Sequence, residues 1–127
     1  MEFSPELILI GEDQNPKVAE DLTPAAPGTV FPVDQDLYFE SGGTWNKGGP
    51  AGEAHGSGIA TEKNLAQCSV TFAFRDGTIV AEGILPIQGK KLGAGQLAVT
   101  GGTGRYKNRL GQVDMETRNP KRWSFVI

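Results

Sequence analysis

The chain has 127 residues, of which 18 are glycine and 8 are proline, and its formal net charge is −3. That length predicts one domain over residues 1–127, and 38 % apolar residues with so many turn formers favour short strands joined by turns over disorder. Lysine and arginine are scattered and form no basic run, so we expect no nucleic-acid partner.

The first residues and the cysteine content indicate a cellular compartment. The apolar run at residues 7–10 is too short for a signal-peptide core or a membrane span, and two acids but no basic residue precede it. Cys68 is the only cysteine, which excludes an internal disulfide. We therefore expect a cytoplasmic protein with no membrane association.

Apolar and polar residues alternate along much of the chain, whereas helical periodicity is broken throughout by glycine or proline. The proline-rich residues 11–27 and the glycine-rich residues 41–52 predict two flexible loops, and the second loop would present Trp45 as a lid. Pro32 cannot donate to a strand ladder and is a candidate break. The predicted strands cover residues 6–10, 28–40, 53–64, 66–75, 78–86, 95–101, 110–118 and 122–127.

Asp76-Gly77 predicts a two-residue hairpin turn between the fourth and fifth strands. Such a turn would pair Phe74 with Ile79. One face of this hairpin is then wholly apolar and the other is mixed, so the apolar face should point inward, because a slip by one residue would expose it to water. The apolar face consists of Cys68, Val70, Phe72, Phe74, Ile79, Ala81 and Leu85.

The same alternation assigns the faces of three further strands and predicts an apolar interior with very few ionisable groups. The outward residues of the second strand are Asp34, Asp36, Tyr38 and Glu40. The inward residues are Phe31, Val33, Leu37 and Phe39 in the second strand, Val113, Met115 and Thr117 in the seventh, and Trp123, Phe125 and Ile127 in the last.

Residues 101–104 (GGTG) predict a sharp corner where a strand ends, followed by Arg105 and Tyr106. Short antiparallel strands, a tight turn and a glycine corner are what a small closed β-barrel needs. A barrel of this size can hold one apolar ligand, which makes ligand binding the leading functional hypothesis.

Motifs for metal, nucleotide or nucleophilic chemistry do not occur in the sequence, so no metal and no cofactor is expected. Cys68 is interpreted as a small buried apolar residue, because no cation is placed to lower the pKa of its thiol. His55, the only histidine, is interpreted as a strand residue and would act as an acid or base only if it lined the cavity. Tyr106 is interpreted as a plug at the base of the barrel beside Arg105. Tyr38 would face outward unless a bulge near Pro32 redirects it.

Three segments occur in a diagnostic order: residues 76–83 (DGTIVAEG), residues 97–106 (LAVTGGTGRY) and Gly111. Over about residues 28–118 they resemble the allene oxide cyclase and dirigent superfamily. The resemblance implies an all-β fold, an eight-stranded antiparallel β-barrel (allene oxide cyclase-like) with an apolar lumen. It also implies a hydrophobic or polyene substrate whose cyclisation or coupling is steered by shape.

Within that superfamily, residues 33–38 (VDQDLY), the glycine-rich loop after them and the Gly-Arg-Tyr corner are similar to the small bacterial spirotetronate-forming Diels–Alder cyclases. The resemblance implies that the strand after the corner supplies lumen residues at positions 113, 115 and 117. Those residues are smaller here and include no tryptophan, so the resemblance does not imply a shared substrate.

We therefore expect a cofactor-independent cyclase of natural-product biosynthesis that performs a [4+2] cyclisation of a linear polyene polyketide. Tyr38 is the candidate catalytic hydrogen-bond donor. The alternatives are a non-catalytic carrier of hydrophobic small molecules and a dirigent-like template that needs an external oxidase. The candidate substrate-binding residues are Trp45, Cys68, Val70, Phe72, Phe74, Ala81, Val113, Met115, Thr117 and Trp123.

The expected subunit arrangement follows from the mixed outer face of the predicted hairpin. Val80 and Ile84 are apolar residues on that face, where a monomer would expose them to water. We therefore expect a homodimer or a homotrimer in which a partner subunit covers them.

Overall fold

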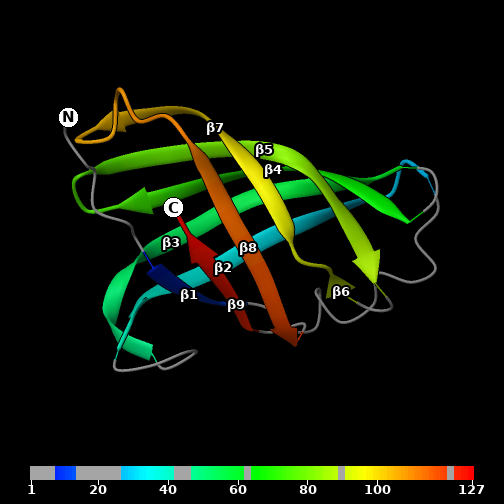
Figure 1. The fold of residues 1–127 in the computed structure, drawn as a ribbon, viewed down its shortest axis with the longest axis horizontal. Coiled ribbons are helices and arrows are strands. Elements are labelled where there is room, and N and C mark those ends of the chain that lie inside the picture. Colours follow the sequence, from blue (N-terminus) through cyan, green and yellow to red (C-terminus); the bar gives the residue numbers. More distant parts are fainter. Residues whose placement is uncertain (1–7, 14–26, 42–46, 62–63, 89–90, 120–121) are drawn as a thin grey trace.

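The computed structural model describes residues 8–13, 27–41, 47–61, 64–88, 91–119 and 122–127, and in these ranges the chain forms strands and turns but no helix (Figure 1). No helix in the described part is therefore long and apolar enough to cross a membrane. The strands are β1 (Ile8–Asp13), β2 (Val30–Glu40), β3 (Lys47–Ala60), β4 (Leu65–Phe74), β5 (Gly77–Gln88), β6 (Lys91–Leu92), β7 (Gly95–Gly104), β8 (Gln112–Asn119) and β9 (Arg122–Val126).

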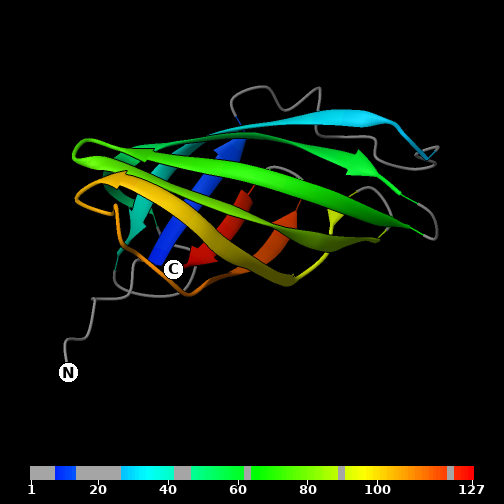
Figure 2. The ribbon, with the colours of Figure 1, turned by 90° about the horizontal axis from the view of Figure 1, so that it is seen from above.

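Eight of these strands form a closed antiparallel β-barrel, which confirms the predicted fold class. Neighbours in the ring follow the order β1-β2-β3-β4-β5-β7-β8-β9, and β9 pairs back with β1. The two-residue strand β6 pairs with the end of β5, outside the ring. In Figure 1, β8 and β9 cross obliquely in front of the long strands β2 to β5, and Figure 2 shows the same arrangement from above.

The barrel closes where β1 meets β9, through five residue pairs from Ile8–Val126 to Glu12–Arg122. On the outer face Glu12 reinforces this ladder. It accepts a hydrogen bond from Nε of Arg122 at 3.1 Å and one from Nζ of Lys47 at 3.0 Å. Desolvation alone would raise the pKa of Glu12, but these two cations outweigh it and lower the pKa below its ordinary value.

The hairpin between β4 and β5 lies two residues away from the predicted register. Its turn is Arg75-Asp76, which pairs Phe74 with Gly77 rather than with Ile79. Because side chains alternate with a period of two, a shift of two residues leaves every side chain on its predicted face. The inward residues Cys68, Val70, Phe72, Ile79, Ala81 and Leu85 are all buried.

The observed register brings the hairpin turn against the glycine corner at the end of β7. A Cβ atom on Gly77 would overlap the carbonyl oxygen of Thr103, and one on Gly104 would overlap that of Asp76. Gly104 also has φ +61°, in the left-handed region that favours glycine. The backbone N–H of Arg105 then donates to the Asp76 carbonyl at 3.0 Å. The close backbone approach explains why Gly77 belongs to the strand and not to the turn.

Two predicted loops are shorter than expected. Residues 11–13 belong to β1 and residues 47–52 belong to β3. The glycines and Pro50 in this part of β3 are accommodated because the register with β2 shifts on either side of Tyr38. The remaining parts of these two loops lie mostly outside the described residues, and Trp45 is among the residues that are not described.

Replacing Gly104 by alanine should lower the free energy of unfolding by about 1–3 kcal/mol, because the left-handed φ is strained for alanine and the new Cβ would overlap the Asp76 carbonyl. Gly101→Ala is the matched control, since a Cβ at this position meets nothing within 4 Å. Its effect should stay within about 0.5 kcal/mol. Urea unfolding followed by tryptophan fluorescence measures both, and equal losses would contradict this explanation of the corner.

Candidate functional site

The barrel interior is lined by apolar side chains from all eight strands of the ring, and these form one continuous cluster. The inward assignments of the last two strands are confirmed, since Val113, Met115, Trp123, Phe125 and Ile127 are buried. In β2, Val33 and Leu37 are buried as predicted, whereas Phe39 lies near one end of the barrel and is 45 % exposed. The side chains of Phe31 and Thr117 lie outside the described residues.

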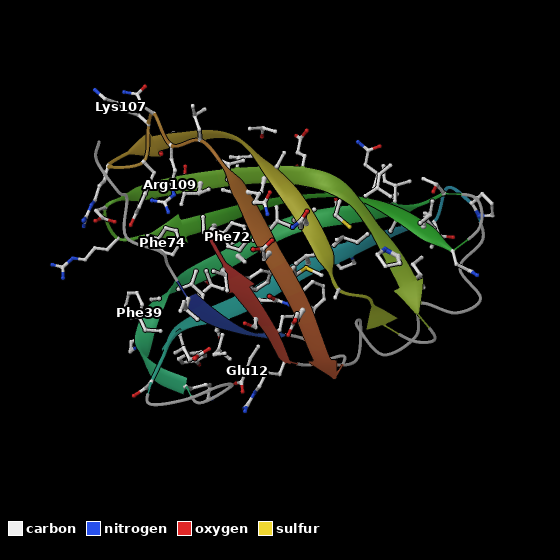
Figure 3. All side chains as sticks on the ribbon, in the orientation of Figure 1. Glu12, Phe39, Phe72, Phe74, Lys107 and Arg109 are labelled. Atoms are coloured by element: carbon white, nitrogen blue, oxygen red, sulfur yellow. The ribbon has the colours of Figure 1, made fainter. Side chains whose placement is uncertain are left out.

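Two phenylalanines meet across the middle of the interior. Phe72 of β4 and Phe125 of β9 come from opposite sides of the ring, and their ring centroids lie 5.0 Å apart in an edge-to-face arrangement (Figure 3 labels Phe72). Trp123 extends this group, with its ring centroid 6.0 Å from that of Phe125. Such aromatic pairs add about 0.5–1.5 kcal/mol beyond the area they bury. The three rings form an aromatic centre in the interior.

Gln35 is the one buried polar side chain among the described residues. It lies on β2 between the inward residues Val33 and Leu37. A Cβ atom on Gly11 would overlap the Gln35 Oε1 atom and lie 2.8 Å from the ring of Phe125, so Gly11 makes room for the amide beside the aromatic centre. Gln35 is not among the residues predicted to face inward, although strict alternation from Val33 to Leu37 places it there.

The interior offers no acid, base or thiolate within the described residues. The only buried polar or charged side chain there is the neutral amide of Gln35. Burial raises the pKa of the Cys68 thiol to about 11, so the thiol is protonated at neutral pH. This agrees with the interpretation of Cys68 as a small apolar residue. Among the described residues, the interior therefore offers apolar surface and one amide.

Tyr38 lies on the outer face of the barrel. The Nζ atom of Lys47 is 4.6 Å from the centroid of its ring. Pro32 pairs with Ser57 without a register shift, so no bulge at Pro32 redirects the side chains of β2. The sequence left the orientation of Tyr38 open, and the outward orientation is the one observed. A phenol there cannot donate a hydrogen bond to a molecule inside the barrel.

The other candidate substrate-binding residues converge on the interior, apart from Trp45 and the side chain of Thr117, which are not described. Phe74 is only partly buried and packs on Tyr106, with ring centroids 5.3 Å apart. Its place is therefore near one end of the barrel, at the edge of the core. The fully inward candidates are Cys68, Val70, Phe72, Ala81, Val113, Met115 and Trp123.

Tyr106 lies beside Arg105 at this end of the barrel, where the sequence predicts a plug, and it is only partly buried. Its ring packs against the core through Phe74, and its hydroxyl is hydrogen bonded to the carboxylate of Asp76. Desolvation and the negative charge of Asp76 raise the pKa of Tyr106. Arg105 holds the same carboxylate at 3.2 Å. These three residues tie the hairpin turn to the corner that follows β7.

His55 lies on the outer face of β3 and does not line the interior. Its Nδ1 atom is 2.8 Å from Oδ1 of Asp34, and its Nε2 atom is 3.6 Å from Oε1 of Glu53. The hydrogen bond with Asp34 is the main cause that raises the pKa of His55 above 6.5. Among the residues with described placement, no group of three or more histidine, cysteine or acidic side chains is suited to hold a metal ion.

Comparisons with known proteins address the fold. No protein-family model matches the chain, and no curated protein matches it significantly. Among solved structures, one described as "Pyocyanin demethylase" has a TM-score of 0.71 at 23 % identity and covers 97 % of this chain and 98 % of its own. The chain has a dirigent-like barrel fold. The solved structures of two pterocarpan synthase dirigent proteins are similar to it, with TM-scores of 0.69 and 0.67.

The dirigent-like barrel is matched over nearly its whole length by both dirigent proteins. PsPTS1 is 21 % identical and covers 96 % of this chain and 91 % of its own. GePTS1 is 19 % identical and covers 97 % of this chain and 84 % of its own. These proteins share the barrel fold with allene oxide cyclase-like proteins, as the sequence resemblance implies. At such identities the likeness establishes the architecture and leaves the activity to the site itself.

Asp34→Asn should lower the pKa of His55 towards its ordinary value, because it removes the carboxylate that stabilises the imidazolium. Since the folded pKa is raised, the stability from this pair is fully present below the unfolded pKa and is lost as pH rises through the folded pKa. An NMR titration of this only histidine measures the shift. Glu116→Gln is the control, and an equal shift in both variants would refute the assignment.

Proposed function

We propose that the dirigent-like barrel binds an apolar small molecule in its interior and acts on it as a cofactor-independent cyclase, with [4+2] cyclisation of a linear polyene as the favoured reaction. One observation carries the proposal: a closed ring of strands presents apolar side chains around the amide of Gln35, the one buried polar side chain in the described part of the chain. A pericyclic reaction has an uncharged transition state and needs no strong acid or base, which suits this interior.

The main catalytic effect would be conformational. A flexible polyene has to bring its diene and dienophile into contact, and holding it folded removes rotational entropy before the transition state. In the best intramolecular reactions such positioning contributes about 7–11 kcal/mol. Phe72, Phe125 and Trp123 would supply the surfaces against which the chain folds.

Gln35 would supply polarity at one point. Its amide can donate a hydrogen bond to a carbonyl on the dienophile, withdrawing electron density and determining which face reacts. Tyr38, the donor suggested by the sequence, points away from the interior and has no part in this proposal.

Two other functions need the same interior. A carrier for hydrophobic small molecules is favoured by the absence of acid, base or thiolate among the described interior residues. A dirigent-like template for coupling is favoured by the similarity to the pterocarpan synthase dirigent proteins. The likeness to "Pyocyanin demethylase" adds pyocyanin as a probe, because a planar ring system would suit the aromatic centre.

We also propose that the barrel assembles as a homodimer or homotrimer in the cytoplasm. The support for assembly is the outer face of β5, where Ile84 is 58 % exposed and Val80 is half-buried. Sedimentation measures the assembly state, and a monomer at high concentration would contradict the proposed assembly.

The reaction can be tested directly. Purified protein is incubated with a linear polyene tetronate without cofactor or oxidant, and products are followed by chromatography with mass detection. A cyclised isomer of unchanged mass supports the cyclase. Tight binding without conversion supports the carrier, and product that appears only with an added oxidase supports the template. If neither the polyene nor pyocyanin binds, the proposed interior site is refuted.

Gln35→Leu should reduce kcat for the cyclisation at least about tenfold, because the transition state loses its one interior hydrogen bond. Thermal unfolding of the variant distinguishes a loss of catalysis from a loss of folded protein. Gln67→Leu on the exposed face of β4 is the matched control. Unchanged kcat in Gln35→Leu would exclude the amide from the reaction.

A further inference from the structure

Basic residues gather at one end of the barrel. Arg75 lies in the β4–β5 turn, and Arg105, Lys107 and Arg109 follow the end of β7, while Asp76 is the only acid in these two segments. Figure 3 shows Lys107 and Arg109 at the same end of the molecule as Phe74. The chain as a whole carries a net charge of −3, so the sign of the charge is locally reversed here.

Backbone hydrogen bonds fix the turn that carries Lys107 and Arg109. The turn after β7 is closed by hydrogen bonds from the Lys107 N–H to the Gly104 carbonyl at 3.3 Å and from the Arg109 N–H to the Tyr106 carbonyl at 3.0 Å. The Arg109 Nη2 atom also donates to the Ile127 carbonyl at 3.0 Å. Arg105 is paired with Asp76, whereas Arg75 and Lys107 are exposed.

Part of the apolar core reaches solvent at the same end as these cations. Ala51, Phe74 and Tyr106 are only partly buried, yet all three pack against the core. Phe74 pairs with Gly77 at the hairpin end and contacts the Tyr106 ring. Phe72 and Ile79, farther along the same two strands, are fully buried. A molecule that arrives at this end therefore meets Phe74 and Tyr106 before it meets the fully buried core.

We propose that this end is the entrance to the barrel and that the ligand carries an anionic head group, a carboxylate or a phosphate, held by Arg75 and Lys107 with help from Arg105 and Arg109. The apolar part of the ligand would pass Phe74 and Tyr106 into the interior. This inference rests on the proposed interior site and adds the charge and direction of its ligand.

The chemistry of the two regions explains why one ligand would use both. An ionised head group cannot enter the apolar interior without a large desolvation cost, so it stays at the wet end of the barrel. Guanidinium and ammonium groups bind carboxylate and phosphate through charge-assisted hydrogen bonds. An anionic amphiphile satisfies both regions, whereas a neutral apolar molecule gains nothing from the cations.

A matched set of probes tests this inference. Dodecanoate, dodecyl phosphate and dodecanol have the same chain length and differ in the head group, and calorimetry below their micellar concentrations measures each affinity. We expect at least one anion to bind about tenfold more tightly than the alcohol at low salt. The ratio should fall in 0.5 M salt, where charges are screened over about 3–5 Å. The order of the two anions distinguishes a carboxylate ligand from a phosphate ligand.

Variants connect the preference to the cations. The double variant Arg75→Ala with Lys107→Ala should reduce the preference for the anion about three- to tenfold and leave the affinity for dodecanol unchanged, since each exposed cation contributes modestly. Asn108→Ala, in the same turn, is the uncharged control. Butyrate has the head group without the long chain, and it should bind far more weakly than dodecanoate.

The outcomes separate this inference from the function on which it rests. If all three dodecyl probes bind equally, or if the double variant keeps the preference, the anionic head group is refuted while the interior site survives. If butyrate binds as well as dodecanoate, the cations hold a surface ion only, and the entrance is refuted. If no dodecyl probe binds while the polyene or pyocyanin does, the anionic head group and the entrance are refuted and the interior site survives. If none of these molecules binds, both proposals fail.

Discussion

The barrel depends on the short ladder between β1 and β9. Without these five residue pairs the sheet would have two open edges, and its apolar face would meet water. Both faces of the seam are reinforced: Phe125 packs against Gly11 inside, and Glu12 binds Lys47 and Arg122 outside. Because the folded pKa of Glu12 is lowered, this outer contribution is present above the unfolded pKa and is lost as pH falls through the folded pKa.

The sequence predicted the faces of the strands better than their limits. A period of two assigns Phe72 and Met115 inward whatever the register, provided that the error is an even number of residues. The predicted position of the turn was wrong because the turn depends on the contact between Gly77 and Thr103, which lie far apart in the chain. Residues 47–52 were predicted as loop because glycine and proline favour turns, whereas β2 supplies them with ladder partners.

The apolar residues of the candidate site could be predicted from the sequence, whereas its polar and charged residues could not. Gln35 follows the alternation as strictly as its neighbours, but a search for apolar faces passes over an amide. The cations near Phe74 are scattered in sequence and come together only when the β4–β5 turn packs on the corner after β7. The ionisable and the neutral groups are therefore separated. His55 and its carboxylates lie on the outer surface of the barrel, and the neutral thiol of Cys68 lies in the core.

The contact between Phe72 and Phe125 bears on how the barrel interior could change during evolution. The two rings span the width of the barrel, yet the ladders that hold their strands use only backbone groups. Trimming either ring would remove volume from the middle of the core while every strand kept its neighbours. The shape of the interior can thus change by single substitutions, with stability as the limit on how much volume can be removed.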